Sequence, residues 1–313
     1  MNGERGVALI VVMLVLALLA LVVTEFAYSA RLEASMVRAY RDTVLARHLA
    51  EAGVQQAIRE ILSQSQIGAL DESGQLVFYR VLPGQMTPTR VPPLPRTRVP
   101  LGAGEFSYRI TDEAARLNVN AGDPVRMNRL LDALEVDRTQ RDIISDSIQD
   151  WRDGNELHRV HGAESDYYLK LPVPYRARNA NLQDAAELLQ IRGVTPEVYY
   201  GSGGRPGLGG LVTAVALNAV SLNAAPAPVL KAVGLSDAEI DEVVRTRVRT
   251  PYAAVPARFT GRGFTTGSAI FRIEAEGLIG GVSRSQLVAV VRRGRPGRVL
   301  DVTVLSWRPG AGS

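Results

Sequence analysis

VALIVVMLVLALLALVV, residues 7–23, is the stretch that decides the fold of the N-terminal part of this chain. As a helix it would be roughly 25 Å long, which is near the lower limit for crossing the hydrocarbon core of a bilayer. A secretory signal would carry a small-residue cleavage site directly after such a core, whereas Glu25, Phe26 and Tyr28 follow here. The polar stub MNGERG precedes the run. We therefore expect processing after Gly6, which would leave the apolar helix on the mature protein.

Composition narrows the class of protein. The 313 residues are enough for about two domains, and 46% apolar with 22% charged residues is ordinary for a globular protein with one membrane segment. The net charge of +4 comes from dispersed arginines without a block of like charges, so composition alone does not indicate nucleic-acid binding. The absence of cysteine excludes disulfides, thiolate metal sites and cysteine nucleophiles.

The helical character continues beyond the apolar run. Between Thr24 and Leu62 there is no proline, and Gly53 is the only glycine. Apolar residues recur there at helical spacing: Val37, Tyr40, Val44, Val54, Ile58, Ile61 and Leu62. Two interpretations remain open. The helix is either a membrane anchor with a stalk, or an assembly helix whose second half packs on its own domain while its first half packs on neighbouring subunits.

Downstream, strand patterns flank a helical region. Alternation over Gln75–Leu82 and Glu105–Asp112 predicts strands, and six prolines between Pro83 and Pro100 predict an extended loop. The C-terminal segments Ala269–Ala275, Gln286–Arg292 and Leu300–Trp307 are separated by glycine-rich turns, which is typical of an antiparallel meander. Because helical patterns fill the region between Asn118 and Thr250, we expect an α+β fold in which a helical domain is inserted into a sheet.

The helical region contains a weak repeat. Leu117–Ala121 and Leu222–Ala225 each begin with Leu-Asn and small residues, and each precedes a helix, a turn and a second helix. Ser236 with Glu239 predicts a capping box at the start of one of these second helices. Between the copies, Glu187–Glu197 resembles a helix-hairpin-helix with a single glycine in the turn. Such units bind nucleic-acid backbone or simply pack small helical domains.

The densest polar cluster is a candidate calcium site. Calcium takes six to eight oxygen ligands from a backbone that can bend around the ion. The cluster offers Asp150, Asp153, Asn155, Glu156, Glu164 and Asp166, with Gly154 and Gly162 as bends. Its spacing is not that of an EF-hand. The alternative is a solvated acidic loop with Arg152 and Arg159 as charge partners.

Other polar motifs are weaker. His158 and His161 could share a helical face as zinc ligands, but no third ligand has suitable spacing, so surface histidines are expected. GSGGRPGLGG, residues 201–210, fits no phosphate-binding loop and is read as a flexible connector. No nucleophile elbow, HExxH motif or serine–histidine pairing is present, so we do not expect an enzyme.

Taken together, these segments resemble the type II secretion system minor pseudopilin K, also called the general secretion pathway protein K family. The resemblance is carried by Arg5-Gly6 before the apolar helix, LNVN (117–120), IQDWRD (148–153), GAESDYY (162–168), PYRARN (174–179), and the segment from Glu187-Leu188-Leu189 to Tyr200-Gly201. These segments stand in the family's order and cover nearly the whole chain.

The resemblance implies a pilin-like fold in which a long N-terminal helix packs on an antiparallel sheet, with a large all-α domain inserted. It divides the chain into a leader (1–6), a transmembrane and assembly helix (7–62), the first part of the pseudopilin domain (63–117), the insertion (118–255) and the completing strands (256–313). A prepilin peptidase would cut between Gly6 and Val7 and methylate the new amino terminus. The insertion would bind calcium.

The resemblance also implies partners and a location. The protein would be anchored once in the bacterial inner membrane, with its globular part in the periplasm. It would join the minor pseudopilins I and J, above the major pseudopilin, at the tip of a pseudopilus that exports folded proteins across the outer membrane. No nucleic acid is implied. The alternative remains a membrane-anchored helix-hairpin-helix protein of a DNA-uptake system.

One position refines this expectation. Most pilin-like subunits carry glutamate at the fifth mature position, whereas this chain has Val11 there, as the K type implies. A glutamate within the membrane needs a partner charge to be tolerated. We hypothesise that a subunit without it does not pair with the amino terminus of a neighbour above it, which favours a cap position.

Overall fold

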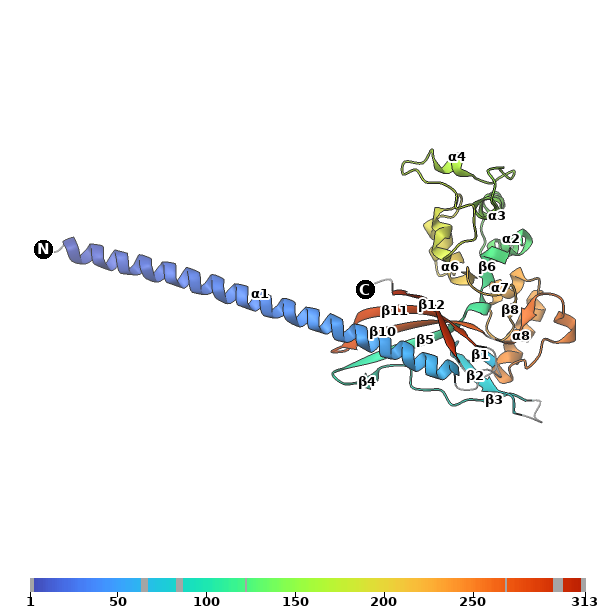
Figure 1. Ribbon diagram of the computed structural model, residues 1–313, viewed down its shortest axis with the longest axis horizontal. Helices are drawn as coiled ribbons and strands as arrows, with labels where there is room; N and C mark the ends of the chain where they lie inside the picture. Colours follow the sequence, from blue (N-terminus) through green and yellow to red (C-terminus); the bar gives the residue numbers. More distant parts are fainter. Residues whose placement is uncertain are drawn as a thin grey trace.

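A long helix projects from a globular head in the computed structural model of the chain (Figure 1). The structure describes residues 3–62, 67–82, 87–121, 123–267, 269–294 and 301–310. Helix α1 (Gly3–Leu62) contains all of the predicted N-terminal helix. The head combines a sheet, over which the second half of α1 lies, with a helical insertion at the end of the molecule farthest from the N-terminus.

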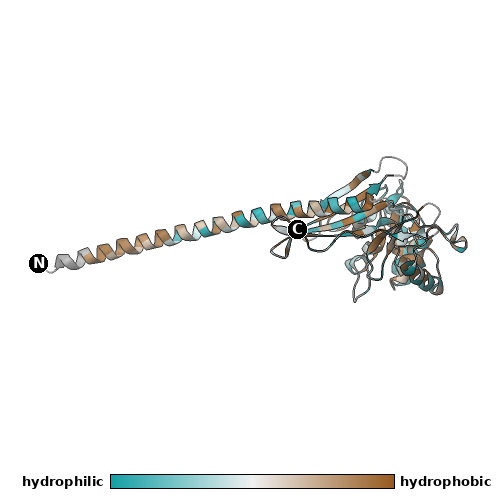
Figure 2. Ribbon diagram, turned by 90° about the horizontal axis from the view of Figure 1, so that it is seen from below, coloured by the Kyte–Doolittle hydropathy of each residue, from teal (hydrophilic) through white to brown (hydrophobic). Residues whose placement is uncertain are grey.

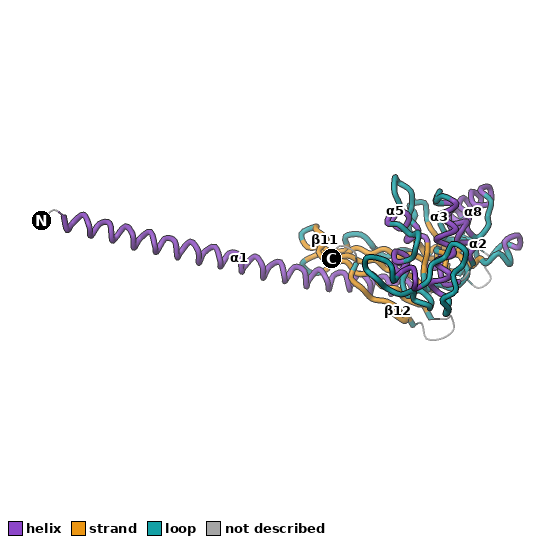
Figure 3. Tube along the Cα trace, turned by 90° about the horizontal axis from the view of Figure 1, so that it is seen from above, coloured by secondary structure: helices purple, strands orange, loops and turns teal. Residues whose placement is uncertain are grey.

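The main sheet has five strands and is antiparallel throughout, as predicted. Figure 3 shows strands alongside the C-terminal part of α1. Across the sheet the order is β12 (Val302–Pro309), β11 (Val282–Arg293), β10 (Ile270–Ile279), β5 (Gly104–Asp112) and β4 (Val99–Leu101). A smaller antiparallel sheet contains β1 (Ile67–Leu70), β2 (Leu76–Arg80) and β3 (Thr89–Arg90). The predicted strands are confirmed, and β10 is longer than expected because its pairing continues through a register shift after Gly277.

Helix α1 lies unusually close to the sheet because small residues face each other. A Cβ atom on Gly277 would stand 1.8 Å from the carbonyl oxygen of Ala46, which no side chain can accommodate. A Cβ on Gly53, the one glycine of the predicted helix, would meet Ala275 and Phe106 at 3.2 Å. The helix and sheet therefore share one tightly packed core.

The two halves of α1 have opposite surroundings. From Ala46 to Ile61 one face of the helix is buried against the sheet, as the assembly-helix interpretation expected. From Leu9 to Arg41 every residue is exposed, including the predicted stripe at Val37 and Tyr40. Figure 2 shows this first half as a rod without covering structure, hydrophobic toward its N-terminal end and mixed nearer the head. By length and composition, α1 qualifies as a helix that could cross a membrane.

The proline-rich loop is pinned to α1 by a buried polar cluster. Arg96 binds Glu60 with two hydrogen bonds, of 2.6 and 3.0 Å, and donates to the carbonyl of Leu76 at 2.8 Å. The hydroxyl of Tyr108 also donates to Glu60, at 2.9 Å. Burial and the Glu60 charge raise the pKa of Tyr108 above its ordinary range. The described part of the loop is extended, with only short strands at its ends, as its prolines predicted.

The insertion is built from two similar units. In the first, β6 (Leu117–Asn118) precedes α2 (Pro124–Ala133) and α3 (Arg138–Arg152); in the second, β8 (Val220–Ser221) precedes α7 (Ala227–Ala232) and α8 (Asp237–Arg249). Each unit includes a short parallel strand pair, β6 with β7 (Val212–Thr213) and β8 with β9 (Phe264–Thr265). The repeat in the sequence is therefore a repeat in structure, and the predicted capping box of Ser236 and Glu239 is confirmed.

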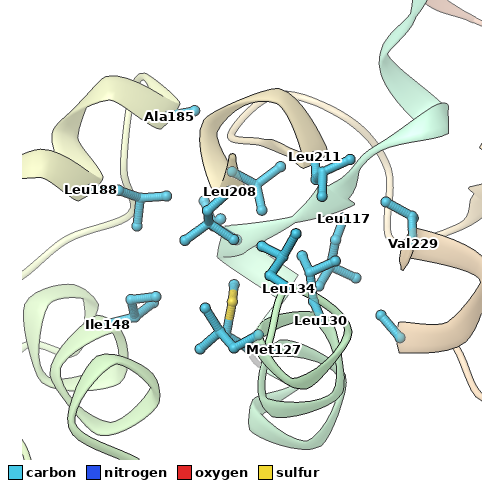
Figure 4. Packing of buried hydrophobic residues seen from close by; sticks show 14 of the residues in the cluster. Leu117, Met127, Leu130, Leu134, Ile148, Ala185, Leu188, Leu208, Leu211 and Val229 are labelled. Atoms are coloured by element: carbon cyan, nitrogen blue, oxygen red, sulfur yellow. The ribbon is translucent and has the colours of Figure 1, made fainter. Parts of the chain in front are cut away.

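Short elements complete the insertion. They are η1 (Glu113–Ala115), η2 (Val119–Ala121), α4 (Ser165–Tyr168), η3 (Ala185–Gln190), α5 (Pro196–Tyr200), α6 (Leu208–Leu211) and η4 (Ala257–Phe259). Figure 4 shows side chains from β6, α2, α3, η3, α6 and α7 converging on one apolar core.

Two details of the predicted insertion are corrected. It is not all-α, because each of its two units contains a short parallel strand pair. Its C-terminal boundary is not residue 255, since Phe259 is fully buried in the insertion's core and β9 pairs with β8 as far as Thr265. Residues up to Thr265 therefore belong to the insertion, and the completing strands of the sheet begin at Ile270.

Candidate functional site

The candidate calcium residues lie where α3 ends and a long loop begins. Asp150, in the last turn of α3, is fully buried. Arg159 bridges it to Asp153 through one nitrogen, Nη1, which lies 2.6 Å from an oxygen of each carboxylate. Gly162 permits this closure, because a Cβ there would overlap the Asp150 carboxylate. A positive group already sits between two of the predicted ligands.

Glu164 is the least satisfied group of the loop. Its side chain is 1% exposed, and among the described residues neither carboxylate oxygen has a hydrogen-bond partner. Burial, followed by the negative charges of Asp150, Asp153 and Glu156, raises the pKa of Glu164 to about 7. The loop therefore holds more negative charge than its own cations neutralise, and part of that charge is withdrawn from water.

The remaining predicted ligands have different surroundings. Glu156 accepts hydrogen bonds from the backbone and hydroxyl of Ser165, at 3.1 and 2.9 Å, and from the Asn179 amide at 2.9 Å. The side-chain amide of Asn155 donates to Asp153 at 2.8 Å. Asp166 pairs instead with His158 at 2.7 Å and Lys170 at 3.2 Å. The structure thus gathers Asp150, Asp153, Glu156 and Glu164 in one electrostatic neighbourhood.

The fit to a divalent cation is good in chemistry and incomplete in geometry. Unpartnered carboxylate oxygens beside two further carboxylates are the hard donors that calcium prefers. Within the described residues, however, no group of three or more acidic or histidine side chains has the arrangement of a metal site. The Arg159 guanidinium would have to move aside for an ion to contact Asp150 and Asp153 together.

The hairpin that suggested DNA binding is directed into the protein. Gly193, in its turn, packs on Ile143 and Ile144 of α3, and its carbonyl accepts a hydrogen bond of 2.9 Å from Gln140. Arg192 donates to the carbonyl of Gly162 at 2.9 Å and stacks over the Tyr167 ring. A glycine turn whose arginine is engaged internally does not offer the basic face that DNA binding requires.

The weaker motifs have structural explanations. His158 contacts Asp166 across the exposed loop, and the backbone amide of His161 donates to Asp146, so the two histidines do not converge. The glycine-rich stretch 201–210 runs from the end of α5 into α6, and Arg205 within it forms an ion pair of 2.7 Å with Glu135. Nothing in these contacts resembles a phosphate-binding loop.

Sequence reasoning missed the group that joins the insertion to the sheet. Glu113 is fully buried between Arg116, at 3.1 Å, and Arg272 of β10, at 2.6 Å, and it also accepts a hydrogen bond from Thr213. Burial alone would raise the pKa of Glu113, but the two arginine charges outweigh it and the pKa ends below its ordinary value. Arg272 and Thr213 are 159 and 100 residues away, so no local pattern reveals the cluster.

Similarity to known proteins agrees with this architecture. The sequence model of the family described as type II secretion system (T2SS), protein K matches residues 110–201. The type II secretion system protein K of Pectobacterium carotovorum subsp. carotovorum is 30% identical over 280 residues, covering 81% of this chain and 78% of that protein. This chain belongs to the type II secretion system protein K family. A protein K from Pseudomonas aeruginosa is 25% identical over 327 residues, covering 95% of this chain and 91% of that protein.

A solved structure supports the fold. The chain superposes with a TM-score of 0.65 on a chain from the crystal structure of the GspK–GspI–GspJ complex of the enterotoxigenic Escherichia coli type 2 secretion system. The sequences are 16% identical, and the match covers 90% of this chain and all of the other. The predicted pilin-like fold and the resemblance to minor pseudopilin K are confirmed. An exposed apolar N-terminal helix in a protein K is consistent with a single-pass inner-membrane anchor.

Proposed function

We propose that this minor pseudopilin caps the tip of a type II secretion pseudopilus, initiates its assembly with I- and J-type pseudopilins, and supports export of folded proteins across the outer membrane. The observation that carries the proposal is that the two ends of the molecule differ in structure (Figure 1). The bare half of α1 extends from one end, and the insertion occupies the other end. A subunit of this shape can pack its helix among others below, while its insertion obstructs a further subunit above.

The N-terminus fits the same role. Val11 gives the apolar segment no carboxylate to pair with a neighbour's amino terminus, which supports a terminal position. Cleavage between Gly6 and Val7 by a prepilin peptidase, with methylation of Val7, would free the helix to leave the inner membrane for the fibre. The globular head would then lie in the periplasm. N-terminal sequencing of the mature protein should begin at Val7, and an intact MNGERG stub would contradict this processing.

Co-purification tests the assembly role. The full chain, expressed with I- and J-type pseudopilins of the same bacterium and a prepilin peptidase, should yield a stable membrane-extracted complex. Tyr40→Ser removes a ring that is 75% exposed on α1 and should weaken the complex without changing the melting temperature of the head. Val125→Ser, at an exposed valine on α2, is the matched control and should have no effect. Failure of the unmodified chain to form any complex would refute the role.

We also propose that the acidic loop binds a structural calcium ion, with Asp150, Asp153 and Glu164 as the central ligands and Asn155, Glu156 and Asp166 as further candidates. Support comes from the buried, unpartnered oxygens of Glu164 beside two more carboxylates. A bound ion would neutralise this charge and fix the loop to the end of α3.

Chelation tests the calcium proposal. At saturating calcium the melting temperature of the insertion should be about 5 °C higher than with excess chelator. Trp151, whose ring lies 5.1 Å from that of Tyr168, reports the change by fluorescence. Asp150→Asn should abolish the calcium effect, whereas Asp237→Asn, an exposed carboxylate paired with Lys231, should retain it. If the melting temperature of the unmodified chain is the same with saturating calcium and with excess chelator, the loop holds no structural calcium ion.

A further inference from the structure

The two edges of the main sheet differ in their protection. An edge strand exposes unpaired backbone groups that can pair with another chain, and proteins usually shield such edges with short strands, proline or charge. At one edge, β4 has three residues, and Pro100 occupies its centre. At the other edge, β12 has eight residues and no proline before Pro309. Among the described residues, no strand pairs with the outer side of β12.

The backbone groups that face outward from β12 can be assigned. The amide of Gly310 donates to Gln286 at 2.9 Å, and the amide of Gly294 donates to Asp301 at 2.7 Å, so these two pairs are hydrogen-bonded. Bonded and non-bonded pairs alternate along an antiparallel ladder. The backbones of Val302, Val304 and Trp307 therefore point away from β11, with Leu305 as the extra residue where the register shifts.

The side chains of the same three residues form an apolar ledge. Val304 and Trp307 are paired with Val291 and Ala289, which belong to the core beneath α1. Val302 is paired with Arg293, whose guanidinium lies over the Phe271 ring of the same core, so all three residues lie on that face of the sheet. The ledge continues the sheet's core, against which Val302 packs. Val304 is 47% exposed and Trp307 40% exposed, because α1 packs on β10, β11 and β5 and leaves β12 uncovered. Unpaired backbone and apolar surface thus coincide at the same positions.

The opposite face beside this edge is basic. Thr303 stands next to the exposed Arg292 of β11, and Arg308, which reaches Asp184 at 2.5 Å, also faces this side. An added strand would therefore meet apolar surface on one face and the exposed Arg292 on the other. A segment that alternates apolar with acidic or polar residues complements both faces.

We propose that β12 is a docking edge for an extended segment of another polypeptide, which adds to the sheet as a sixth strand and places apolar residues beside Val304 and Trp307. A second copy of this chain does not suit the edge. Antiparallel pairing of two β12 strands would turn their α1 helices in opposite directions, and both could not then enter one membrane from the same side. The inference rests on the proposed assembly role, which supplies partner chains held in the same membrane.

A proline substitution separates backbone pairing from packing. Val304→Pro removes an outward amide that β11 does not use, and proline is tolerated at such edge positions. It should lower the affinity of the full chain for the I- and J-type pseudopilins about tenfold, the equivalent of about one main-chain hydrogen bond. Val304→Thr keeps the amide and is the matched control, with unchanged melting temperature expected for both. Equal binding by the proline variant would overturn the proposal.

Amide hydrogen exchange gives a second test. It uses the unmodified full chain, so its result does not depend on whether a variant folds. In the isolated chain, Val304 and Trp307 should exchange fast while Ser306 and Arg308 are protected. In the complex with the I- and J-type pseudopilins, Val304 and Trp307 should become protected. If the complex forms and these amides still exchange fast, strand addition at β12 is wrong. If no complex forms with the unmodified chain, the assembly role itself fails.

Discussion

The two helix-pair units of the insertion share a frame and differ in what is attached to it. In each, an arginine near the end of the second helix donates to carbonyls of the Leu-Asn segment that opens the unit. Arg152 reaches Val119 at 2.5 Å, and Arg247 reaches Leu222 at 3.2 Å and Ala225 at 2.7 Å. The first unit then continues into the acidic loop, whereas the second returns to β9 through residues 250–263, which include η4.

Their attachment to the sheet differs as well. Two ion pairs attach the first unit to the sheet. They join Glu113 to Arg272 of β10, and Asp184 to Arg308 of β12. The second unit is held by packing and backbone, since Ala224 is buried in the sheet's core and the amide of Leu70 donates to the carbonyl of Asn223 at 3.1 Å. One structural unit therefore occurs twice, and the two copies are attached to the rest of the head by different kinds of contact.

The largest expected effect breaks the ionic attachment. Glu113→Ala leaves the largely buried Arg116 and Arg272 without their shared partner and should destabilise the junction by about 3 kcal/mol in chemical denaturation. The matched variant Glu113→Gln keeps the shape and removes the charge. Equal stability of the alanine variant and the unmodified chain would show that the first unit is not held by this cluster.

Acid should loosen the two units in order. The folded-state pKa of Glu113 lies below its ordinary value of 4.5, so its ionised form stabilises the fold at neutral pH. That stability is lost as the pH falls from about 4.5 through the folded-state pKa. Hydrogen exchange measured across this range should increase first in β6 and β7, and later in α7 and α8. Glu113→Gln should abolish this order, and simultaneous opening of both units in the unmodified chain would contradict it.

A smaller effect compares the two arginines. Arg247 is buried, serves two carbonyls and has its pKa lowered to about 10 by desolvation. Arg247→Ala should cost about 3 kcal/mol, and Arg152→Ala, with a single carbonyl partner among the described residues, about half as much. Both are measured by urea denaturation. A larger loss at Arg152 would mean that the units are not equivalent.

The smallest effect concerns the helix caps. Asp137 caps α3 and Ser236 caps α8 in corresponding positions. Alanine at either should cost about 1 kcal/mol, measured as the shift in the urea midpoint. Similar values would support the equivalence of the units, and a difference of several-fold would show that one cap carries additional contacts.

The sequence predicted those parts of the fold that depend on local periodicity. Helix α1, the strands of the meander and the capping box at Ser236 follow from residue spacing within one element. The end of the insertion could not be found in this way, because β9 has two residues whose partner strand ends at Ser221.

The candidate calcium site was predictable in composition but not in arrangement. A run of acids and glycines indicated the loop, and the structure brings Asp150, Asp153 and Glu164 into one neighbourhood. The sequence could not indicate that Arg159 lies between two of the carboxylates. Nor could it indicate that Asp166 pairs with His158 and Lys170. Side chains of equal charge are distinguished only by the loop's path, which long-range packing determines.

The tight seat of α1 on the sheet has a mechanical consequence. The helix is clamped from Ala46 to Ile61, roughly 24 Å of its length, while about 65 Å projects beyond the clamp. Because Gly277 and Ala46 pack without space between them, we expect the head and the projecting part of α1 to move as one rigid body. A tilt of about 10° at the head sweeps the free end of the rod by about 11 Å. When the apolar end of α1 is held in place, the direction of the helix therefore determines the orientation of the acidic loop at the opposite end of the molecule.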